Sequence, residues 1–561
     1  MYADDLTILM SGKNISTTNE IIQDTLNNLQ NFAVRNGIIF SKTKSVAIVF
    51  NKSNINLNPA LHIDNTKLKL VNEVKILGLT FDQKMLWNTH IAKLRTNCYQ
   101  KLNILKSIAG KNWGADSTIL RNTYLALIRS KMDYGSFIYG CARPLRKLDV
   151  VNNEAARIIS GAFRSSPIHS LLAEANLLPL EIRRKQLVLN YASKIVRFPQ
   201  HSNYQTILNN NNNMYKHSFS FKLHDHLNSI KSHIPKILCQ DNHLIQPPWK
   251  LSAQSTVISP DLDILNEVRM YKPDADYITN LFQHKSNTTY HDHTFIFTDA
   301  SISKNKVGCA ALILNEVTID RRIPDAFSVI SAECLAILQA LDIVKQREEE
   351  LFVICSDSAD ALVALSLPYS NNPFINNIKE AVFDLQNSSP FPKIKFLWIP
   401  AHSGIEGNEM ADISAKKAAK KRQCSNIPVY YKDLREHWSK LTLKNWHISW
   451  ENLVDHKYTR HIKDNNGALS LTRKEQVLIS RLKLGHTNIS HLYLMINENP
   501  PICDVCNKRI TVEHLITECI KYDNQRRKNN ITEIEMINLG ESVNIKKVLQ
   551  FLKDTELYKK I

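Results

Sequence analysis

The sequence predicts a multidomain protein that combines α/β and α parts, with a mixed five-stranded sheet and flanking helices as its α/β portion. Three observations support this prediction. The chain has 561 residues, of which 43% are hydrophobic, and that length suits about three or four domains. Five apolar runs rich in β-branched and aromatic residues lie between residues 294 and 400, separated by segments with helical spacing. The stretches 96–290 and 423–561 show mainly helical periodicity.

The first three strands follow one another closely and are expected to form an antiparallel meander. The run TFIFTDAS contains Phe295 and Phe297 and brings Asp299 to the end of a strand or into a hairpin. The next two runs are VGCAALIL (307–314) and VTIDRRI (317–323).

A helix, a strand and a second helix follow, which gives the sheet a parallel crossover. Ser331 precedes the helical segment AECLAILQALDIV and places Glu333 in the first turn. The strand LFVICSD carries Asp357 at its end, where Ser358 is positioned to cap the next helix.

The last strand, IKFLWIP, leads into the loop AHSGIEGNEMAD, which carries His402. Asp412 lies on the helix that follows. Because strand ends and helix starts meet at one edge of a mixed sheet, these side chains are expected to converge there. The candidate catalytic residues are Asp299, Glu333, Asp357, Asp412 and His402.

An isolated Asp at a strand end is usually a turn residue or a helix cap, so no carboxylate identifies a site by itself. The joint pattern favours a metal site. Glu333 is the hardest to explain by packing, because an unpaired charge in an apolar helix is costly and a metal would neutralise it. Glu406, Glu409 and Asp360 are interpreted as residues of solvated helix faces and are left out of the site.

Residues 294 to about 421 resemble a type 1 ribonuclease H domain, on the ordered fragments TDAS, AECLAILQAL, SDSADAL and WIPAHSGIEGNEMAD. The resemblance implies endonucleolytic hydrolysis of the RNA strand of RNA–DNA hybrids with two Mg²⁺ ions, or Mn²⁺ in their place. Mg²⁺ prefers hard oxygen ligands and keeps several waters, so a few carboxylates suffice. By resemblance, Asp299 bridges both ions, Glu333 and Asp357 complete one site, and Asp412 completes the other. His402 would move a proton or assist product release.

Three cysteines and a histidine cluster near the C-terminus, with the spacing C-x2-C-x7-H-x4-C. This set supplies four ligands for a closed, structural Zn²⁺ site in a zinc-knuckle-like module. The alternative is that these side chains pack in an ordinary helical domain. Lys508, Arg509, Arg526 and Arg527 lie nearby and would let the module contact nucleic acid. The candidate ligands are Cys503, Cys506, His514 and Cys519.

The N-terminus, MYADDLTILMSG, resembles the metal-binding turn of a reverse transcriptase palm, with Asp4 and Asp5 as candidate ligands. NGIIFSKTKSVAIVF (36–50) and VKILGLTFDQKMLWNTHI (74–91) resemble later palm segments of polymerases from non-LTR retrotransposons. With a ribonuclease H segment next and a Cys/His cluster last, the chain resembles the C-terminal part of a jockey-like or I-like element's polyprotein.

That resemblance implies four segments: a truncated palm (1–95), a helical thumb and connection with linkers (96–290), a ribonuclease H domain (291–422) and a helical tail with the Cys/His module (423–561). A polymerase needs a further palm carboxylate and fingers, and these are missing before Met1. We therefore expect that the chain alone does not polymerise DNA. Whether Met1 is a true start or an internal codon stays open.

The net charge of +18 suits a polyanionic partner, which agrees with binding of RNA–DNA hybrid, RNA or DNA. Basic stretches such as IRRKQLVLNYASKIVRF fit a grip on a duplex backbone, or helices with solvated basic faces. With neither a signal sequence nor a run of 18 apolar residues, no membrane association is expected, and the protein is expected inside the cell, in the nucleus, the cytoplasm or both. The segment KKAAKKR (416–422) is either an exposed helix face or a nuclear import signal.

Two hypotheses remain from these patterns. The first is an enzyme that cuts the RNA strand of hybrids. The second is a non-catalytic nucleic-acid-binding product of a truncated or domesticated element. The complete carboxylate set favours the first.

Overall fold

A computed structural model describes residues 5–51, 59–140, 142–208, 219–238, 258–368, 370–387, 391–451, 471–532 and 542–561. The chain divides into two compact units, which we call unit 1 (Met1–Arg184 with Ser449–Ile561) and unit 2 (Lys185–Ile448). These units are bounded differently from the predicted domains, whose limits stay predictions. Within the described ranges, the structure has no helix that is both long and apolar enough to cross a lipid bilayer.

Unit 2 is built on a mixed five-stranded sheet with the strand order β11-β10-β7-β8-β9. β10 runs parallel to both β11 and β7, whereas β7, β8 and β9 form an antiparallel meander. The predicted sheet and its meander are therefore confirmed. The strands are β7 (Thr294–Ser303), β8 (Lys306–Ile313), β9 (Val317–Ile323), β10 (Leu351–Ser356) and β11 (Lys393–Trp398).

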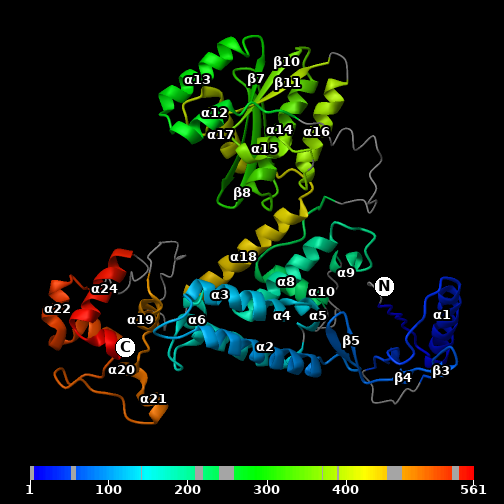
Figure 1. Cartoon of the computed structure of the whole chain (residues 1–561). Coiled ribbons are helices and arrows are strands. Elements are labelled where there is room, and N and C mark those ends of the chain that lie inside the picture. Colours follow the sequence, from blue (N-terminus) through cyan, green and yellow to red (C-terminus); the bar gives the residue numbers. More distant parts are fainter. Residues whose placement is uncertain are drawn as a thin grey trace. The chain divides into compact units, whose positions relative to one another are not determined.

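Helices cover both faces of this sheet (Figure 1). One face carries α14 (Val329–Lys345), α15 (Ala359–Ser366) and α16 (Pro373–Gln386), and the other carries α12 (Asp263–Tyr271), α13 (Ala275–Thr288) and α17 (Glu406–Ala419). A methyl group added at Gly407 of α17 would lie 2.3 Å from the Phe297 ring. The Phe282 ring of α13 packs against Phe295 and Phe297. Phe295 and Phe297 are two residues apart, so they point to the same face of the sheet, which α13 and α17 cover.

One of the two predicted places for Asp299 is confirmed, and one other local prediction needs correction. β7 continues to Ser303 and forms a hairpin with β8, so Asp299 lies inside the strand, one residue beyond the point where pairing with β10 ends at Thr298. Antiparallel pairing with β8 extends the strand past the parallel part. The helix α14 begins at Val329 because Ser328, rather than Ser331, caps it, so Glu333 lies in the second turn. The predicted Ser358 cap of α15 is confirmed.

Among the described residues, four further helices belong wholly or partly to unit 2. They are α8 (Leu180–Ile195), α9 (Tyr204–Leu208), α10 (Phe219–Ser229) and α18 (Tyr431–Glu451). The indole of Trp438 on α18 is fully buried and donates a hydrogen bond to Ser232 at 3.1 Å. Within the predicted thumb and connection, the Asn run Asn209–Asn213 and the pair Pro247–Pro248 have the composition of loops or linkers, and both lie outside the described residues.

Unit 1 has a helical core in which side chains such as Ile91, Leu120 and Val151 are fully buried. The C-terminal helix α19 joins this core through Leu484. The core helices are α2 (Asn88–Ile108), α3 (Ser117–Tyr124), a π-helical turn (Leu125–Arg129), α4 (Ser130–Asp133), α5 (Ser136–Tyr139), a 3₁₀ turn (Arg143–Leu145), α6 (Arg146–Ser160), α7 (Ile168–Glu174) and α19 (Arg473–Leu484).

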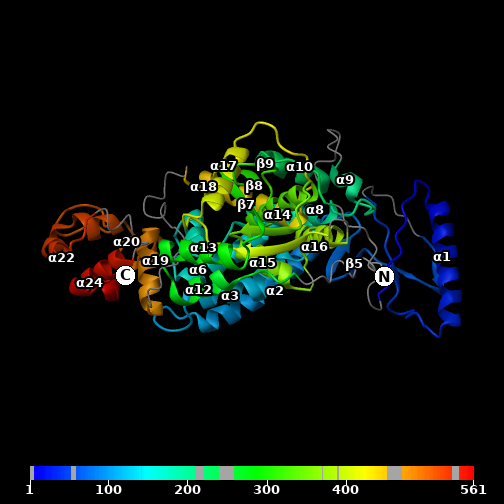
Figure 2. The same ribbon diagram turned by 90° about the horizontal axis from the view of Figure 1, so that it is seen from above.

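The rest of the tail has its own apolar cluster, which includes Ile516, Val548, Phe551 and Leu552. Figures 1 and 2 show α22 beside α24 in this part. Its elements are α20 (Asn488–His491), α21 (Tyr493–Ile496), a π-helical turn (His514–Glu518), a 3₁₀ turn (Ile520–Tyr522), α22 (Asp523–Lys528), α24 (Ser542–Asp554) and α25 (Leu557–Lys560).

The N-terminal segment contains α1 and short strands that pair two by two, as β1 with β4, β2 with β3 and β5 with β6. Helix α1 packs against β2, which pairs with β3, and Figure 1 shows β3 beside α1. They are α1 (Ile15–Arg35), β1 (Val46–Ala47), β2 (His62–Ile63), β3 (Thr66–Lys67), β4 (Lys69–Leu70), β5 (Glu73–Ile76) and β6 (Leu79–Asp82). The truncated palm stays a prediction for this segment.

Candidate functional site

The five predicted catalytic residues all line one cavity of unit 2, with a volume of about 510 Å³. They come from β7, α14, the end of β10, the loop after β11, and α17. The cavity is lined by Asp299, Ala300, Ser301, Ile302, Val329, Glu333, Asp357, Ser358, Ala359, Asp360, Ala401, His402, Asn408, Asp412 and Lys416.

Three of the carboxylates form a tight group: one oxygen each from Asp299, Glu333 and Asp357 lies within 4.8 Å of the others. Glu333 is only 4% exposed, and one of its oxygens accepts a hydrogen bond from the backbone N–H of Ala300 at 3.1 Å. Its other oxygen is buried and has no hydrogen-bond partner in the structure. Because a buried unpartnered carboxylate oxygen is costly, this group suits a divalent cation.

The backbone around Asp357 is held from two sides. The indole N–H of Trp398 donates to the Asp357 carbonyl at 2.9 Å, and Thr298 donates its hydroxyl to the carbonyl of Cys355 at 3.0 Å. These bonds join β7, β10 and β11 at the edge where the carboxylates meet.

Burial and mutual repulsion raise the pKa values of the three carboxylates. Burial, with the nearby charges of Asp357 and Asp412, raises the pKa of Asp299 to about 7. Burial, with Asp299 and Asp357, raises the pKa of Glu333 well above its usual value. Burial is also the main cause that raises the pKa of Asp357. A cation would relieve this repulsion and favour the charged forms.

Asp412 and His402 belong to a second group, in which Glu409 is the third member. The Nδ1 atom of His402 lies 4.0 Å from the Glu409 carboxylate, and the His402 side chain is 71% exposed. Asp412 pairs with Lys416, one helical turn away, at 2.6 Å. The structure therefore places the predicted residues as an inner trio, with Asp299 and Glu333 buried and Asp357 half-buried, and an outer pair in the same cavity.

Sequence reasoning missed several neighbours of these residues. Glu409 is half-exposed but faces His402, and Asp360 is exposed yet lines the cavity, so neither belongs only to a solvated face. The sequence could have identified Glu409, because it lies three residues before the candidate Asp412 and residues three apart share a helix face. Lys416 was available by a similar argument, because it lies four residues, one helical turn, beyond Asp412.

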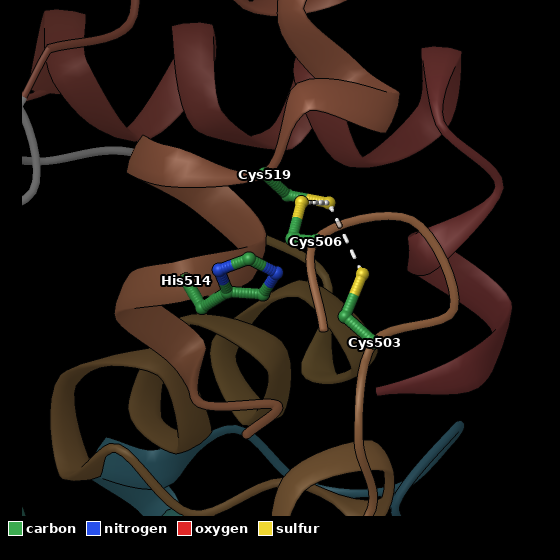
Figure 3. Close-up of side chains that lie close together, drawn as sticks. All are labelled: Cys503, Cys506, His514 and Cys519. Carbon is green, nitrogen blue, oxygen red and sulfur yellow. Dashed lines mark hydrogen bonds between the residues drawn. The ribbon is translucent and has the colours of Figure 1, made fainter. Parts of the chain in front are cut away.

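The Cys/His cluster forms a second candidate metal site, in unit 1 (Figure 3). Ligand atoms of Cys503, Cys506, His514 and Cys519 all lie within 4.8 Å of one another. The sulfur of Cys519 is 3.8 Å from those of Cys503 and Cys506. Tetrahedral Zn²⁺ with Zn–S bonds of about 2.3 Å separates its sulfur ligands by about 3.8 Å, so this group fits Zn²⁺.

The electrostatics of this cluster also suit a metal. The contact with His514 and the backbone N–H groups of Cys506 and Val505 lower the pKa of the Cys503 thiol to about 6. Burial raises the pKa of Cys519 to about 11, so a metal would have to displace its proton. The Nδ1 atom of the buried His514 lies 3.6 Å from the Glu518 carboxylate, an outer contact typical of metal-bound imidazoles.

One basic neighbour of this cluster needs correction. Arg526 is only 8% exposed and donates to the carbonyls of Ile516 and Cys519, at 3.2 and 2.7 Å, so it does not present its charge to a nucleic acid. Arg527, in contrast, has a side chain that is 81% exposed. Of the candidate palm ligands, Asp5 is exposed and Asp4 lies outside the described residues.

A protein-family model described as RNase H matches residues 291–420. A solved structure, the RNase H1 of the halophilic archaeon Halobacterium salinarum NRC-1, aligns with 22% of this chain and 95% of its own, at 17% identity and a TM-score of 0.18. The family model covers the whole sheet and the helices α14 to α17.

Two curated relatives come from insect mobile elements. The Retrovirus-related Pol polyprotein from type-1 retrotransposable element R1 2 of Nasonia vitripennis is 21% identical over 187 residues, which cover 28% of this chain and 45% of the relative. The RNA-directed DNA polymerase from mobile element jockey of Drosophila funebris is 26% identical over 166 residues, which cover 29% of this chain and 18% of the relative. The matches thus span less than half of either relative. Residues 291–420 form an RNase H domain, and part of the chain is homologous to the polyproteins of non-LTR retrotransposons of the R1 and jockey types.

Proposed function

We propose that this chain is a type 1 ribonuclease H that hydrolyses the RNA strand of RNA–DNA hybrids endonucleolytically and depends on Mg²⁺ or Mn²⁺. It would act as part of a retrotransposon reverse transcriptase product. The observation that carries the proposal is the inner trio of Asp299, Glu333 and Asp357, with its raised pKa values and an unpartnered oxygen, inside an RNase H domain.

The trio and Asp412 are the residues that would hold the divalent ions. Bound there, such ions would supply activation of a water molecule and stabilisation of the charge that develops on the phosphate oxygens. The chain's own residues keep the oxygens in place: Ala300 orients Glu333, and Trp398 holds the backbone of Asp357. Lys416 compensates the charge of Asp412. The exposed imidazole of His402, beside Glu409, is free to move a proton or to assist product release.

Recognition of the hybrid would use two properties of RNA and its partner strand. The 2′-hydroxyls distinguish RNA from DNA, and the shape and phosphates of the paired DNA strand position the duplex. The net charge of +18 supports affinity for such a polyanion.

A cleavage assay on the full chain tests the proposal. The substrates are a labelled RNA–DNA hybrid, a DNA duplex and single-stranded RNA, each with Mg²⁺ and with EDTA. We expect cleavage of the hybrid's RNA strand with Mg²⁺ only. Asp299→Asn or Asp357→Asn should lower the rate more than about 100-fold, since even outer contacts of a metal ligand are worth about 10–100-fold.

The matched control is Asp342→Asn, which removes an exposed carboxylate from α14, the helix that carries Glu333. It should leave the rate unchanged. A folded wild-type chain that cleaves no hybrid in Mg²⁺ or Mn²⁺ would reject the enzyme and favour the alternative, a non-catalytic nucleic-acid-binding product. That the chain alone does not extend a primer stays a prediction, which a primer-extension assay tests.

We also propose that the tail holds one structural Zn²⁺ on Cys503, Cys506, His514 and Cys519. The support is the sulfur spacing of 3.8 Å and the lowered pKa of Cys503. Because four protein ligands fill a tetrahedral site, the ion would stabilise the fold and would take no part in hydrolysis.

A further inference from the structure

The segment 258–290 precedes the matched RNase H domain, yet it packs on that domain's sheet within unit 2. Asp261 extends the sheet beside the edge strand β11: its N–H donates to the Phe396 carbonyl at 2.7 Å, and its carbonyl accepts from the N–H of Trp398 at 3.0 Å. From this point the chain turns through α12 and α13, and Phe282 of α13 covers Phe295 and Phe297 of β7.

An ionic network holds α13 in this position. The ammonium of Lys285 lies 2.7 and 2.6 Å from the two carboxylate oxygens of Asp261 and 2.8 Å from the carboxylate of Asp263. The hydroxyl of Tyr290 donates to Asp261 at 2.8 Å. The side chains of Lys285 and Asp261 are only 14% and 16% exposed, so little water competes with these bonds.

α13 also contacts the loop that carries His402. The Thr279 hydroxyl lies 2.8 Å from the carbonyl of Ser403 and 2.9 Å from the carbonyl of Ala275, one turn earlier in its own helix, so the two carbonyls share its proton. Ser403 is the neighbour of His402 and is 5% exposed. The loop has an unusual backbone here, because His402 and Gly404 have φ angles of +51° and +79°.

The loop backbone is thus anchored while the His402 ring stays exposed. Ser403 donates its own hydroxyl to the Pro400 carbonyl at 2.9 Å, and Thr279 holds the Ser403 carbonyl from outside the domain. A non-glycine residue with φ near +51° is strained, and this conformation persists only where the surrounding structure holds it. The hydrogen bond from Thr279 to Ser403, the next residue, is one contact that holds it.

We propose that Thr279 is a positioning residue for the ribonuclease site, and that α13 is a brace that keeps the His402 loop at the mouth of the cavity. The expected effect of Thr279 on the cleavage rate rests on the proposed function, whereas its expected effect on the loop does not. It makes the catalytic unit larger than the matched residues 291–420 by at least the segment 258–290.

The test uses Thr279→Val in the full chain, which removes the hydroxyl and keeps the branched shape. Thr288→Val is the matched control, because Thr288 lies on the same helix and makes the same bond one turn back, to the His284 carbonyl at 2.7 Å, without touching the loop. Hydrogen–deuterium exchange of the metal-free proteins reports on residues 401–405. Thr279→Val should accelerate exchange there about fivefold, the effect of one ordinary hydrogen bond, and Thr288→Val should not.

A double-mutant cycle with His402→Ala then asks whether the brace acts through that histidine. We expect Thr279→Val to lower kcat about fivefold with KM nearly unchanged, and to have almost no further effect in the His402→Ala background. Equal exchange in the Thr279 and Thr288 variants, or a loss of kcat that is just as large without His402, would overturn the inference. If the wild-type chain cleaves no hybrid, the proposed function fails, while the exchange experiment still decides whether Thr279 holds the loop.

Discussion

Glu333 places a carboxylate among buried apolar neighbours on α14, where Ala332, Cys334, Ala336 and Ile337 are fully buried. One backbone N–H partners one oxygen, and the other oxygen has none in the structure. The same sequence feature, a glutamate inside an apolar helix, made Glu333 the candidate least easily explained by packing. The structure adds the reasons for its cost: burial disfavours the charged carboxylate most, and Asp299 and Asp357 lie close by and repel it.

The residue scale carries a prediction about pH and metal. Folding raises the pKa of Asp299 from 3.8 to about 7, so between these pH values the folded chain holds a proton that the unfolded chain has lost. This proton adds to the free energy of unfolding at low pH, and its contribution is lost as the pH rises from 3.8 to about 7. The metal-free chain should therefore lose stability from pH 5 to pH 8, and Mg²⁺ should stabilise it more at pH 8, since ligands bind metal deprotonated. Thermal unfolding in EDTA and in Mg²⁺ at both values measures this.

The Asp299→Asn variant is the comparison, because it lacks the Asp299 carboxylate but keeps all other ionisable groups of the wild type. The difference in melting temperature between wild type and variant should change with pH in EDTA. A difference that is the same at pH 5 and pH 8 would show that Asp299 does not titrate in this range.

At the scale of elements, the close contact between α17 and β8 sets where Asp412 lies. Gly308 of β8 sits against the helix backbone: a methyl group there would be 2.4 Å from both the Ala415 carbonyl oxygen and the Ala419 nitrogen. Ala411, Ala415, Ala418 and Ala419 are all buried on the helix. Small residues on both elements allow this approach, which brings α17 and its Asp412 to the cavity.

Gly308→Ala should therefore push α17 away from the sheet. We expect a loss of about 1–3 kcal/mol in the free energy of unfolding, the usual cost of overpacking, together with weaker hybrid cleavage. Chemical denaturation and the cleavage assay measure the two effects. Lys306→Ala, at an exposed position of the same strand, is the control and should change neither. A Gly308→Ala chain as stable as wild type would show that the helix can shift freely.

At the scale of the whole molecule, α19 ties the tail to the helical core of unit 1. Arg473 is buried and donates to the carbonyls of Ile159 and Ile158 at 2.7 and 2.8 Å. Arg481 donates to the Gly161 carbonyl at 3.0 Å. Residues of α19 also join the apolar cluster of the tail, in which Leu482 is fully buried. Unit 1 is thus assembled from both ends of the chain.

This arrangement predicts that zinc stabilises unit 1 as a whole. The purified chain should contain one Zn²⁺, and Cys503→Ser should lose it and lower the midpoint of the unit 1 unfolding transition, because structural zinc contributes directly to folding. The proposed hybrid cleavage, whose candidate site lies in unit 2, should stay nearly unchanged. Cys424→Ser, at an exposed cysteine outside the cluster, is the control. Unchanged metal content in Cys503→Ser would rule out the ligand set.

Local chemistry in the sequence was sufficient for much of this structure. Alternating and helical apolar patterns determined the five strands and the helices between them, and Ser358 determined the start of α15. The types and spacing of acidic, cysteine and histidine residues determined which groups could bind a metal. Apart from Asp4 and Asp5, the structure brings these candidates together in two sites, while their catalytic role stays a proposal.

Tertiary structure alone decided the contacts between distant segments. Thr279 and Ser403 are 124 positions apart, and Arg473 and Ile159 are 314 apart. It also decided that Asp299 lies inside β7, that Glu409 faces His402 and that Arg526 is buried. Periodicity and capping act over a few residues, whereas these placements depend on which surfaces pack together once the elements have formed.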